Sequence, residues 1–153
     1  MNRFAERLRR LLPGPWAGLL LAVALVATPA PFALLAQADA GRVVARILAH
    51  EAYASLALGM VLLALERVAA RQHAEGGQGT QFSIGMVLAG GALFCTVAGY
   101  FGLQPVMAAA RAGQGALSFG QLHALSAAFY LVKTACVLAL AWRVARPVAP
   151  GQA

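Results

Sequence analysis

Four apolar stretches, each long enough to cross a bilayer as a helix, set the strongest limit on how this 153-residue chain can fold. A hydrocarbon core about 30 Å thick needs roughly 20 helical residues. Leu and Ala dominate the stretches, and the period-two alternation typical of strands is absent. We therefore expect an all-α integral membrane protein. It should be a four-helix bundle and a single membrane domain over residues 1–153, with spans at about residues 15–36, 43–65, 82–104 and 120–142.

The composition fits that expectation and argues against a soluble domain. Hydrophobic residues make up 61% of the chain and charged residues 11%, whereas a soluble domain has about 25% charged residues. The net charge of +7 would suggest a nucleic-acid partner if the basic residues formed a patch. Because they lie at the edges of the apolar segments instead, we expect the lipid bilayer as a partner and no nucleic acid.

The distribution of Lys and Arg predicts how the chain lies in the membrane. Cytoplasmic loops carry an excess of these residues, and with four spans one side of the membrane receives most of them. We therefore expect a multi-pass protein of the cell inner membrane with short tails at both termini in the cytoplasm. The cytoplasmic set is Arg3, Arg7, Arg9, Arg10, Arg67, Arg71, Arg143 and Arg146, and the opposite set is Arg42, Arg46 and Arg111.

The N-terminus also resembles a secretory signal. A basic region and an apolar core precede "ADA" at residues 38–40, a possible cleavage site. The apolar region is longer than the core of a typical signal, which has about 7–15 residues. Cleavage would also place the basic loop after residue 65 on the wrong side of the membrane. We therefore expect the first helix to be retained.

The connections between the spans are short and contain helix breakers. Gly76, Gly77 and Gly79 should form a flexible stop after the second helix. Pro105 should end the third helix, and Ser118 is placed to cap the start of the fourth.

The fourth span carries polar residues on one face. His123, Ser126, Tyr130 and Lys133 are spaced i, i+3, i+7 and i+10, which places them in one stripe along a helix. Exposing a central Lys to lipid costs about 2.5–3.5 kcal/mol on the insertion scale. The stripe should therefore face the interior of the bundle, where the Lys can meet a partner.

The second span offers candidate partners for that stripe. Its polar residues divide between two adjacent faces, one with Arg46, His50 and Tyr53 and the other with Glu51 and Ser55. Measured by depth along the two helices, Glu51 can reach either Lys133 or His123. We call the combined set the polar seam, and its members are His50, Glu51, Tyr53, His123, Ser126, Tyr130 and Lys133.

Three interpretations of the polar seam stay open. The seam can be a clamp that orients helices, which have no hydrophobic drive to associate in lipid. Intramembrane ionisable groups also serve as proton relays or substrate sites. The third interpretation is a haem or metal site through His50 and His123, although the chain has no HxxxH spacing and no cysteine near either residue.

Motifs of soluble enzymes are absent from the sequence. The chain contains no GxSxG, no GxxxxGK followed by Ser or Thr, and no HExxH. Cys95 and Cys136 fall inside expected spans without CxxC spacing, which argues against a disulfide framework. We therefore assign no catalytic residue, no metal ligand and no cofactor.

Two stretches carry a family resemblance: "AGRVVARILAHEAYASLALG" at residues 40–59 and "YFGLQPVMAAARAGQGALSFGQLHALS" at residues 100–126. Over about residues 15–142, the chain resembles a bacterial membrane family of unknown function, DUF4149, related to eukaryotic transmembrane protein 205. The resemblance implies a four-helix membrane bundle and no particular reaction. The residues that match the recurrent pattern are Pro29, Pro31, Gly41, Glu51, Tyr53, Gln104, Pro105, Arg111, Phe119, His123 and Ser126.

Together these features predict a non-enzymatic inner-membrane protein that acts as an accessory or interaction partner. One alternative is a small transporter or proton-coupled permease subunit that uses the polar seam. The other is a haem- or metal-binding membrane redox protein. One chain supplies only four helices, so a transport pathway would require a homo-oligomer; a second copy or another membrane protein is the expected partner.

Overall fold

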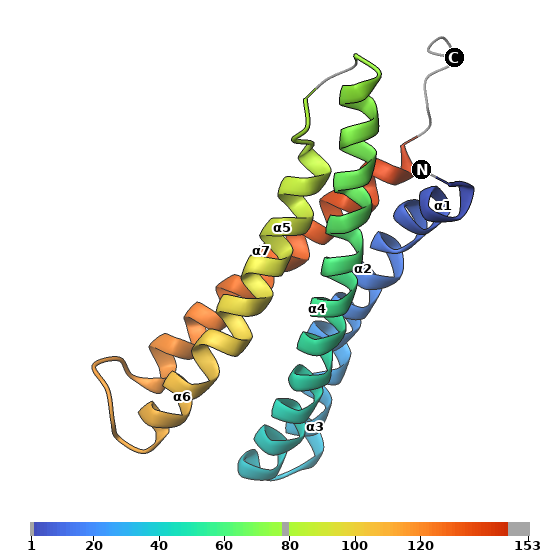
Figure 1. The fold of residues 1–153 in the computed structure, drawn as a ribbon. Coiled ribbons are helices and arrows are strands. Elements are labelled where there is room, and N and C mark those ends of the chain that lie inside the picture. Colours follow the sequence, from blue (N-terminus) through green and yellow to red (C-terminus); the bar gives the residue numbers. More distant parts are fainter. Residues whose placement is uncertain (1, 78–79, 147–153) are drawn as a thin grey trace.

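The computed structural model describes residues 2–77 and 80–146 and shows four long apolar helices packed together (Figure 1). The helices cover Arg3–Leu34, Gln37–Glu75, Ile84–Arg111 and Phe119–Ala145, and each is long and apolar enough to cross a membrane. The predicted all-α, four-helix architecture is therefore confirmed. Each helix is longer than the span expected from the sequence, because helical backbone continues into the polar flanks. The expected C-terminal tail beyond residue 146 lies outside the described residues.

The second and fourth helices, α4 (Gln37–Glu75) and α7 (Phe119–Ala145), are continuous. α4 ends where Gly77 adopts a positive φ of 73°, a conformation that glycine adopts without strain. Ser118 caps α7 as predicted. Its hydroxyl accepts a hydrogen bond from the Gln121 backbone N–H, and the Gln121 side chain accepts one from the Ser118 backbone N–H.

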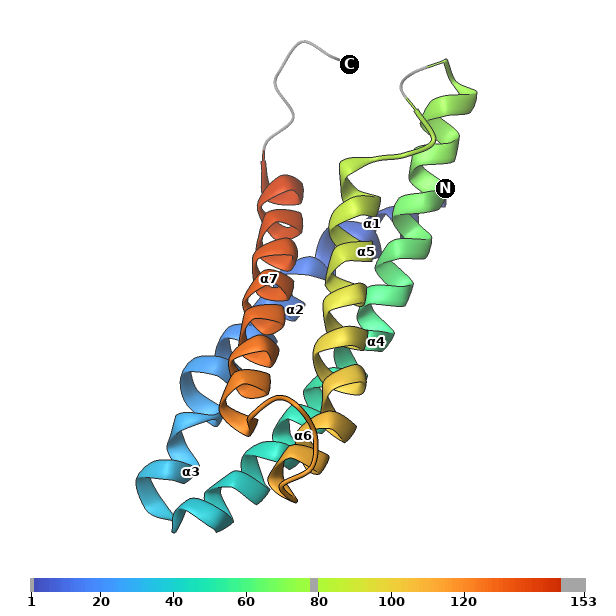
Figure 2. The same cartoon turned by 90° about the vertical axis from the view of Figure 1, so that its left-hand side faces the viewer.

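The first helix is built from four segments: α1 (Arg3–Leu11), α2 (Pro13–Ala22), the π-helical η1 (Val23–Ala27) and α3 (Pro29–Leu34). Pro13 and Pro29 each begin an α-helical segment, where a missing backbone N–H costs little. Prolines and π-helical turns are the usual causes of bends in long helices. Figure 2 shows the result, with α1 turned across the end of the bundle, where it packs against α4 and α7.

The third helix continues through Pro105, so the expectation that this proline ends it is wrong. The helix consists of α5 (Ile84–Thr96), the π-helical η2 (Val97–Gly102) and α6 (Leu103–Arg111). The wider turns of η2 end at Gly102, three residues before Pro105. Such a local change of helix type accommodates a proline ring that would clash with a regular turn.

Close packing is concentrated in the half of the bundle that contains α1 and the end of α7, which we call the packed half. A buried cluster there joins α2, α4, α5 and α7. Its members are Trp16, Ala17, Leu20, Leu62, Ala89, Ala92, Val137 and Leu140. In the other half, which we call the open half, α3 and the start of α4 diverge from α6 and the start of α7 (Figure 1).

Small residues allow α4 and α5 to approach closely in the packed half. A Cβ atom at Gly59 would lie 2.8 Å from a Leu93 carbon and 3.2 Å from the Trp16 ring. At these distances an extra carbon at Gly59 has no room unless the helices shift apart. Gly18 differs, because no neighbouring atom lies within 4 Å of the place its Cβ would take.

We expect Gly59→Val to destabilise the bundle by about 1–3 kcal/mol, the usual cost of overpacking. The matched control is Gly18→Val, which adds the same side chain to a helix position with open space. Denaturant unfolding of each purified variant in detergent measures its loss of stability. Equal losses for the two variants would show that helix propensity, and not the α4–α5 contact, determines the effect.

Candidate functional site

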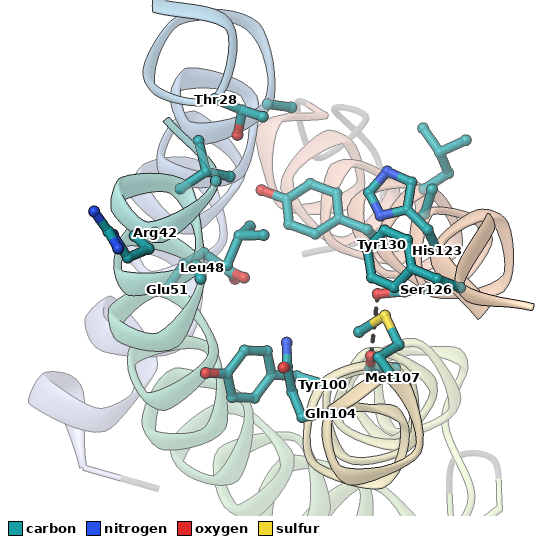
Figure 3. A pocket seen from close by; sticks show the side chains of 18 of the residues that line it. Thr28, Arg42, Leu48, Glu51, Tyr100, Gln104, Met107, His123, Ser126 and Tyr130 are labelled. Atoms are coloured by element: carbon teal, nitrogen blue, oxygen red, sulfur yellow. Dashed lines mark hydrogen bonds between the residues drawn. The ribbon is translucent and has the colours of Figure 1, made fainter. Parts of the chain in front are cut away.

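The open half of the bundle contains a half-open cavity of about 850 Å³. Its lining is mostly apolar and comes from all four membrane helices. Figure 3 shows Tyr100, Tyr130 and His123 among the polar side chains that surround it, opposite Leu48 and Glu51 on α4. A concave, largely apolar space of this size with a few polar groups is typical of small-molecule sites.

The cavity extends far along the helices. Its lining residues run from Gln37 to Glu51 on α4 and from Phe119 to Lys133 on α7. Each run is about 14 residues long, or about 21 Å at 1.5 Å per residue. The cavity therefore reaches from the ends of the helices in the open half to the border of the packed half.

A buried ion pair lies at the inner end of the cavity. The Lys133 ammonium donates hydrogen bonds of 2.8 and 2.9 Å to the two carboxylate oxygens of Glu51. The two side chains are only 4% and 3% exposed. Breaking such a pair leaves an uncompensated buried charge, so the contact fixes α7 against α4 at this depth.

Two further side chains extend this ion pair into the packed half. The Ser55 hydroxyl donates a short hydrogen bond to the Glu51 carboxylate, and the Trp16 indole N–H donates to the Ser55 oxygen at 2.9 Å. The chain Trp16–Ser55–Glu51–Lys133 therefore connects α2, α4 and α7. Sequence reasoning missed the role of Trp16, although a tryptophan that becomes buried usually finds a partner for its N–H.

The stripe on α7 is held by contacts with the other helices. The Tyr130 hydroxyl donates to the backbone oxygen of Leu20 at 2.9 Å. The Tyr130 ring also lies 4.6 Å from the Lys133 ammonium, within range of a cation–π contact. The Ser126 hydroxyl donates to the Gly99 carbonyl at 3.2 Å. These bonds orient α7 relative to the first and third helices.

Aromatic and basic residues lie at the outer end of the cavity. The Arg111 guanidinium sits 4.5 Å from the centre of the Phe119 ring, and that ring stacks on His123 with 5.9 Å between centroids. Arg42 forms an ion pair with Asp39 across one turn of α4. The rim therefore carries positive charge from two walls, and one carboxylate balances part of it.

The structure brings five members of the polar seam to the cavity and leaves two away from it. Glu51, Lys133, Tyr130, Ser126 and His123 line the cavity. The other two, on the adjacent face of α4, lie outside the lining.

His50 and Tyr53 occupy that adjacent face. His50 is exposed, and its ring nitrogen Nδ1 lies 2.9 Å from the Arg46 carbonyl oxygen of its own helix. Tyr53 is 63% exposed and makes an edge contact with Phe101. The structure therefore does not bring His50 and His123 together. Within residues 2–77 and 80–146, no group of three or more His, Cys, Asp or Glu side chains is arranged to hold a metal ion.

We expect the Glu51–Lys133 pair to behave as one unit in stability measurements. Glu51→Gln and Lys133→Met should each destabilise the protein by about 3–5 kcal/mol, because each leaves a buried charge or polar group without its partner. The double variant should recover most of that loss, since both charges are gone. Denaturant unfolding in detergent tests this, and simple addition of the two losses would show that the groups are not coupled.

Comparison with known proteins agrees with the resemblance seen in the sequence. Residues 11–116 match the family described as a domain of unknown function, DUF4149. The match extends from the last residue of α1 to beyond α6 and includes Glu51, but it ends before α7. Neither the curated proteins nor the solved structures gave a match. With more than half of its length matched, this multi-pass membrane chain belongs to the DUF4149 family.

Proposed function

We propose that this protein is a non-enzymatic membrane protein that binds an amphipathic small molecule in the cavity of its open half. The observation that carries the proposal is the cavity itself, which has about 850 Å³ of space within one chain. An apolar lining about 21 Å long suits a hydrocarbon or aromatic body. The ionisable groups at its inner end hold each other in an ion pair, which favours a binding role over a catalytic one.

The charge at the rim favours a ligand with an acidic head. Arg42 and Arg111 line the outer part of the cavity, while Asp39 is the carboxylate paired there with Arg42. The Arg111 guanidinium lies over the Phe119 ring, and a guanidinium placed over an aromatic ring can still donate from its edge. A carboxylate or phosphate at the rim, with its apolar part deeper in the cavity, would match both regions.

The location and assembly of the protein belong to the same proposal. The excess of Lys and Arg at the packed half supports the cell inner membrane with both termini in the cytoplasm, so the cavity would open toward the opposite side. The relation to transmembrane protein 205 rests on the two quoted stretches. A single chain contains the whole cavity, so binding requires no second copy, although a homo-oligomer or another membrane protein remains the expected partner for an accessory role.

A second candidate is a small transporter or proton-coupled permease subunit. The position of the Glu51–Lys133 pair favours it, because the pair separates the cavity from the packed half. A substrate moving further would have to pass this pair, so the contact between Glu51 and Lys133 would have to open. The haem or metal alternative has no such support, since His50 lies away from the cavity that His123 lines.

Binding can be tested with a chain-brominated fatty acid, a probe with an apolar chain and one carboxylate. Bromine quenches tryptophan fluorescence at short range. The Trp142→Phe variant leaves Trp16 as the single tryptophan, hydrogen-bonded to Ser55 beside the inner end of the cavity. In nanodiscs we expect saturable quenching. Ala127→Phe, which fills part of the cavity, should weaken the apparent affinity at least about tenfold, or about 1.4 kcal/mol.

The matched control for this experiment is Ala128→Phe. Ala127 and Ala128 are neighbouring exposed positions on α7, but only Ala127 lines the cavity. The control should keep the affinity of the parent protein. Quenching that rises linearly with the probe, or that is the same in both variants, would mean that the fatty acid merely dissolves in the lipid around the bundle.

The orientation can be tested with reporter fusions at Gly76 and Gly113, which follow α4 and α6 at opposite ends of the bundle. We expect a cytoplasmic reporter to be active at Gly76 and a periplasmic reporter at Gly113, because the basic flanks lie on the side of Gly76. Periplasmic activity at Gly76 would reverse the assignment and would place the cavity opening in the cytoplasm.

A further inference from the structure

A second, smaller cavity lies at the opposite end of the molecule, in the packed half. Its volume is about 220 Å³, and it forms where α1, α4 and α7 meet. Unlike the large cavity, it is lined mainly by charged side chains. The lining residues are Arg9, Arg10, Glu66, Leu140, Arg143, Val144 and Arg146.

Two of its four arginines are already held by carboxylates. Arg9 donates to Glu66 at 2.9 Å and to Glu6 at 3.0 Å, and Arg10 pairs with Glu6 at 2.6 Å. Arg143 and Arg146, from the end of α7, form no ion pair with any residue of the described part of the chain. The four arginines outnumber the two carboxylates, Glu6 and Glu66, so the pocket carries an excess of positive charge.

The position of Glu66 is fixed by close packing against α5. A Cβ atom at Gly85 would lie 2.0 Å from a Glu66 carboxylate oxygen and 3.2 Å from the Arg143 guanidinium. Glu66 itself is only 4% exposed. The carboxylate is therefore buried at the wall of the pocket and neutralised by Arg9, while the guanidinium of Arg143 sits beside it at the exposed side.

The depth of the pocket in the membrane can be read from its neighbours. Trp142 precedes Arg143 and is 67% exposed, and Leu11 follows Arg10 and is 68% exposed. Exposed tryptophans of membrane proteins are enriched at the level of the lipid headgroups. Basic pockets at this level of a helix bundle meet the anionic headgroups of the bilayer.

We infer that this pocket binds the phosphate of an anionic phospholipid headgroup, with Arg143 and Arg146 as the donors. A guanidinium presents a planar fork of N–H groups that matches phosphate oxygens. The exposed apolar surface of Trp142 and Leu11, which neighbour Arg143 and Arg10 in the sequence, suits the acyl chains of the same lipid. A free phosphate would gain nothing from that apolar surface, which is why the lipid is the preferred source. The inference is independent of the ligand proposed for the large cavity.

Native mass spectrometry of the detergent-purified full chain, titrated with phosphatidylglycerol, tests this assignment. We expect the double variant Arg143→Gln, Arg146→Gln to bind phosphatidylglycerol about 30-fold more weakly, as the loss of two arginines near a membrane surface predicts. The double variant Arg143→Lys, Arg146→Lys keeps the charge but not the fork of N–H groups. Its affinity for phosphatidylglycerol should fall between those of the parent chain and the double Gln variant. Thermal unfolding in neutral detergent confirms that each variant is folded.

The matched control is Arg67→Gln, Arg71→Gln. These exposed arginines lie near the same end of the bundle, on α4, but outside the pocket. The control should bind phosphatidylglycerol with nearly the affinity of the parent chain. An equal loss in both double variants, or equal binding of phosphatidylcholine, would overturn the proposed site. Inorganic phosphate that binds alone with the same residue dependence, without phosphatidylglycerol binding, would overturn the lipid as its source.

Discussion

The buried ion pair between Glu51 and Lys133 is the contact on which the arrangement of the bundle depends. In lipid, apolar surfaces alone give helices little reason to associate, whereas an unpaired charge in the hydrocarbon region is costly. Glu51 and Lys133 can pair only when α4 and α7 lie at the matching depth in the membrane and are rotated so that the two side chains face each other. Ser55 and Trp16 extend the same constraint to the first helix. The pair also marks the boundary between a tightly packed half and a half with an internal cavity.

Much of this architecture could be predicted from the sequence because a bilayer limits the choices. The four spans followed from apolar length, and Ser118 was recognisable as a helix cap. The stripe on α7 followed from helical periodicity, which places residues three or four apart on one face. All four of its members, from His123 to Lys133, line the cavity. Periodicity works here because α7 contains no π-helical segment between those residues.

Other features depend on how the helices pack in three dimensions, which cannot be predicted from the periodicity of the sequence. The second span had polar residues on two adjacent faces, and either face could have turned inward. The structure turns Glu51 inward and leaves His50 and Tyr53 outside, because Lys133 offers the carboxylate a partner. The cavity depends on how far the helices diverge, and helical periodicity says nothing of that distance. The pairing of Arg9 with Glu66 links residues 57 apart, which local spacing cannot reveal.

The separation of Glu51 and Lys133 along the chain has a consequence for biogenesis. The two residues are 82 positions apart, so the carboxylate is synthesised long before the ammonium that neutralises it. At a synthesis rate of about 5–20 residues per second, that interval is roughly 4–16 s. During this time Lys133 is not yet present to pair with Glu51, and the carboxylate must be hydrated or sheltered by the insertion machinery. The fourth helix therefore supplies the ionic partner that the second helix lacks while it is being made.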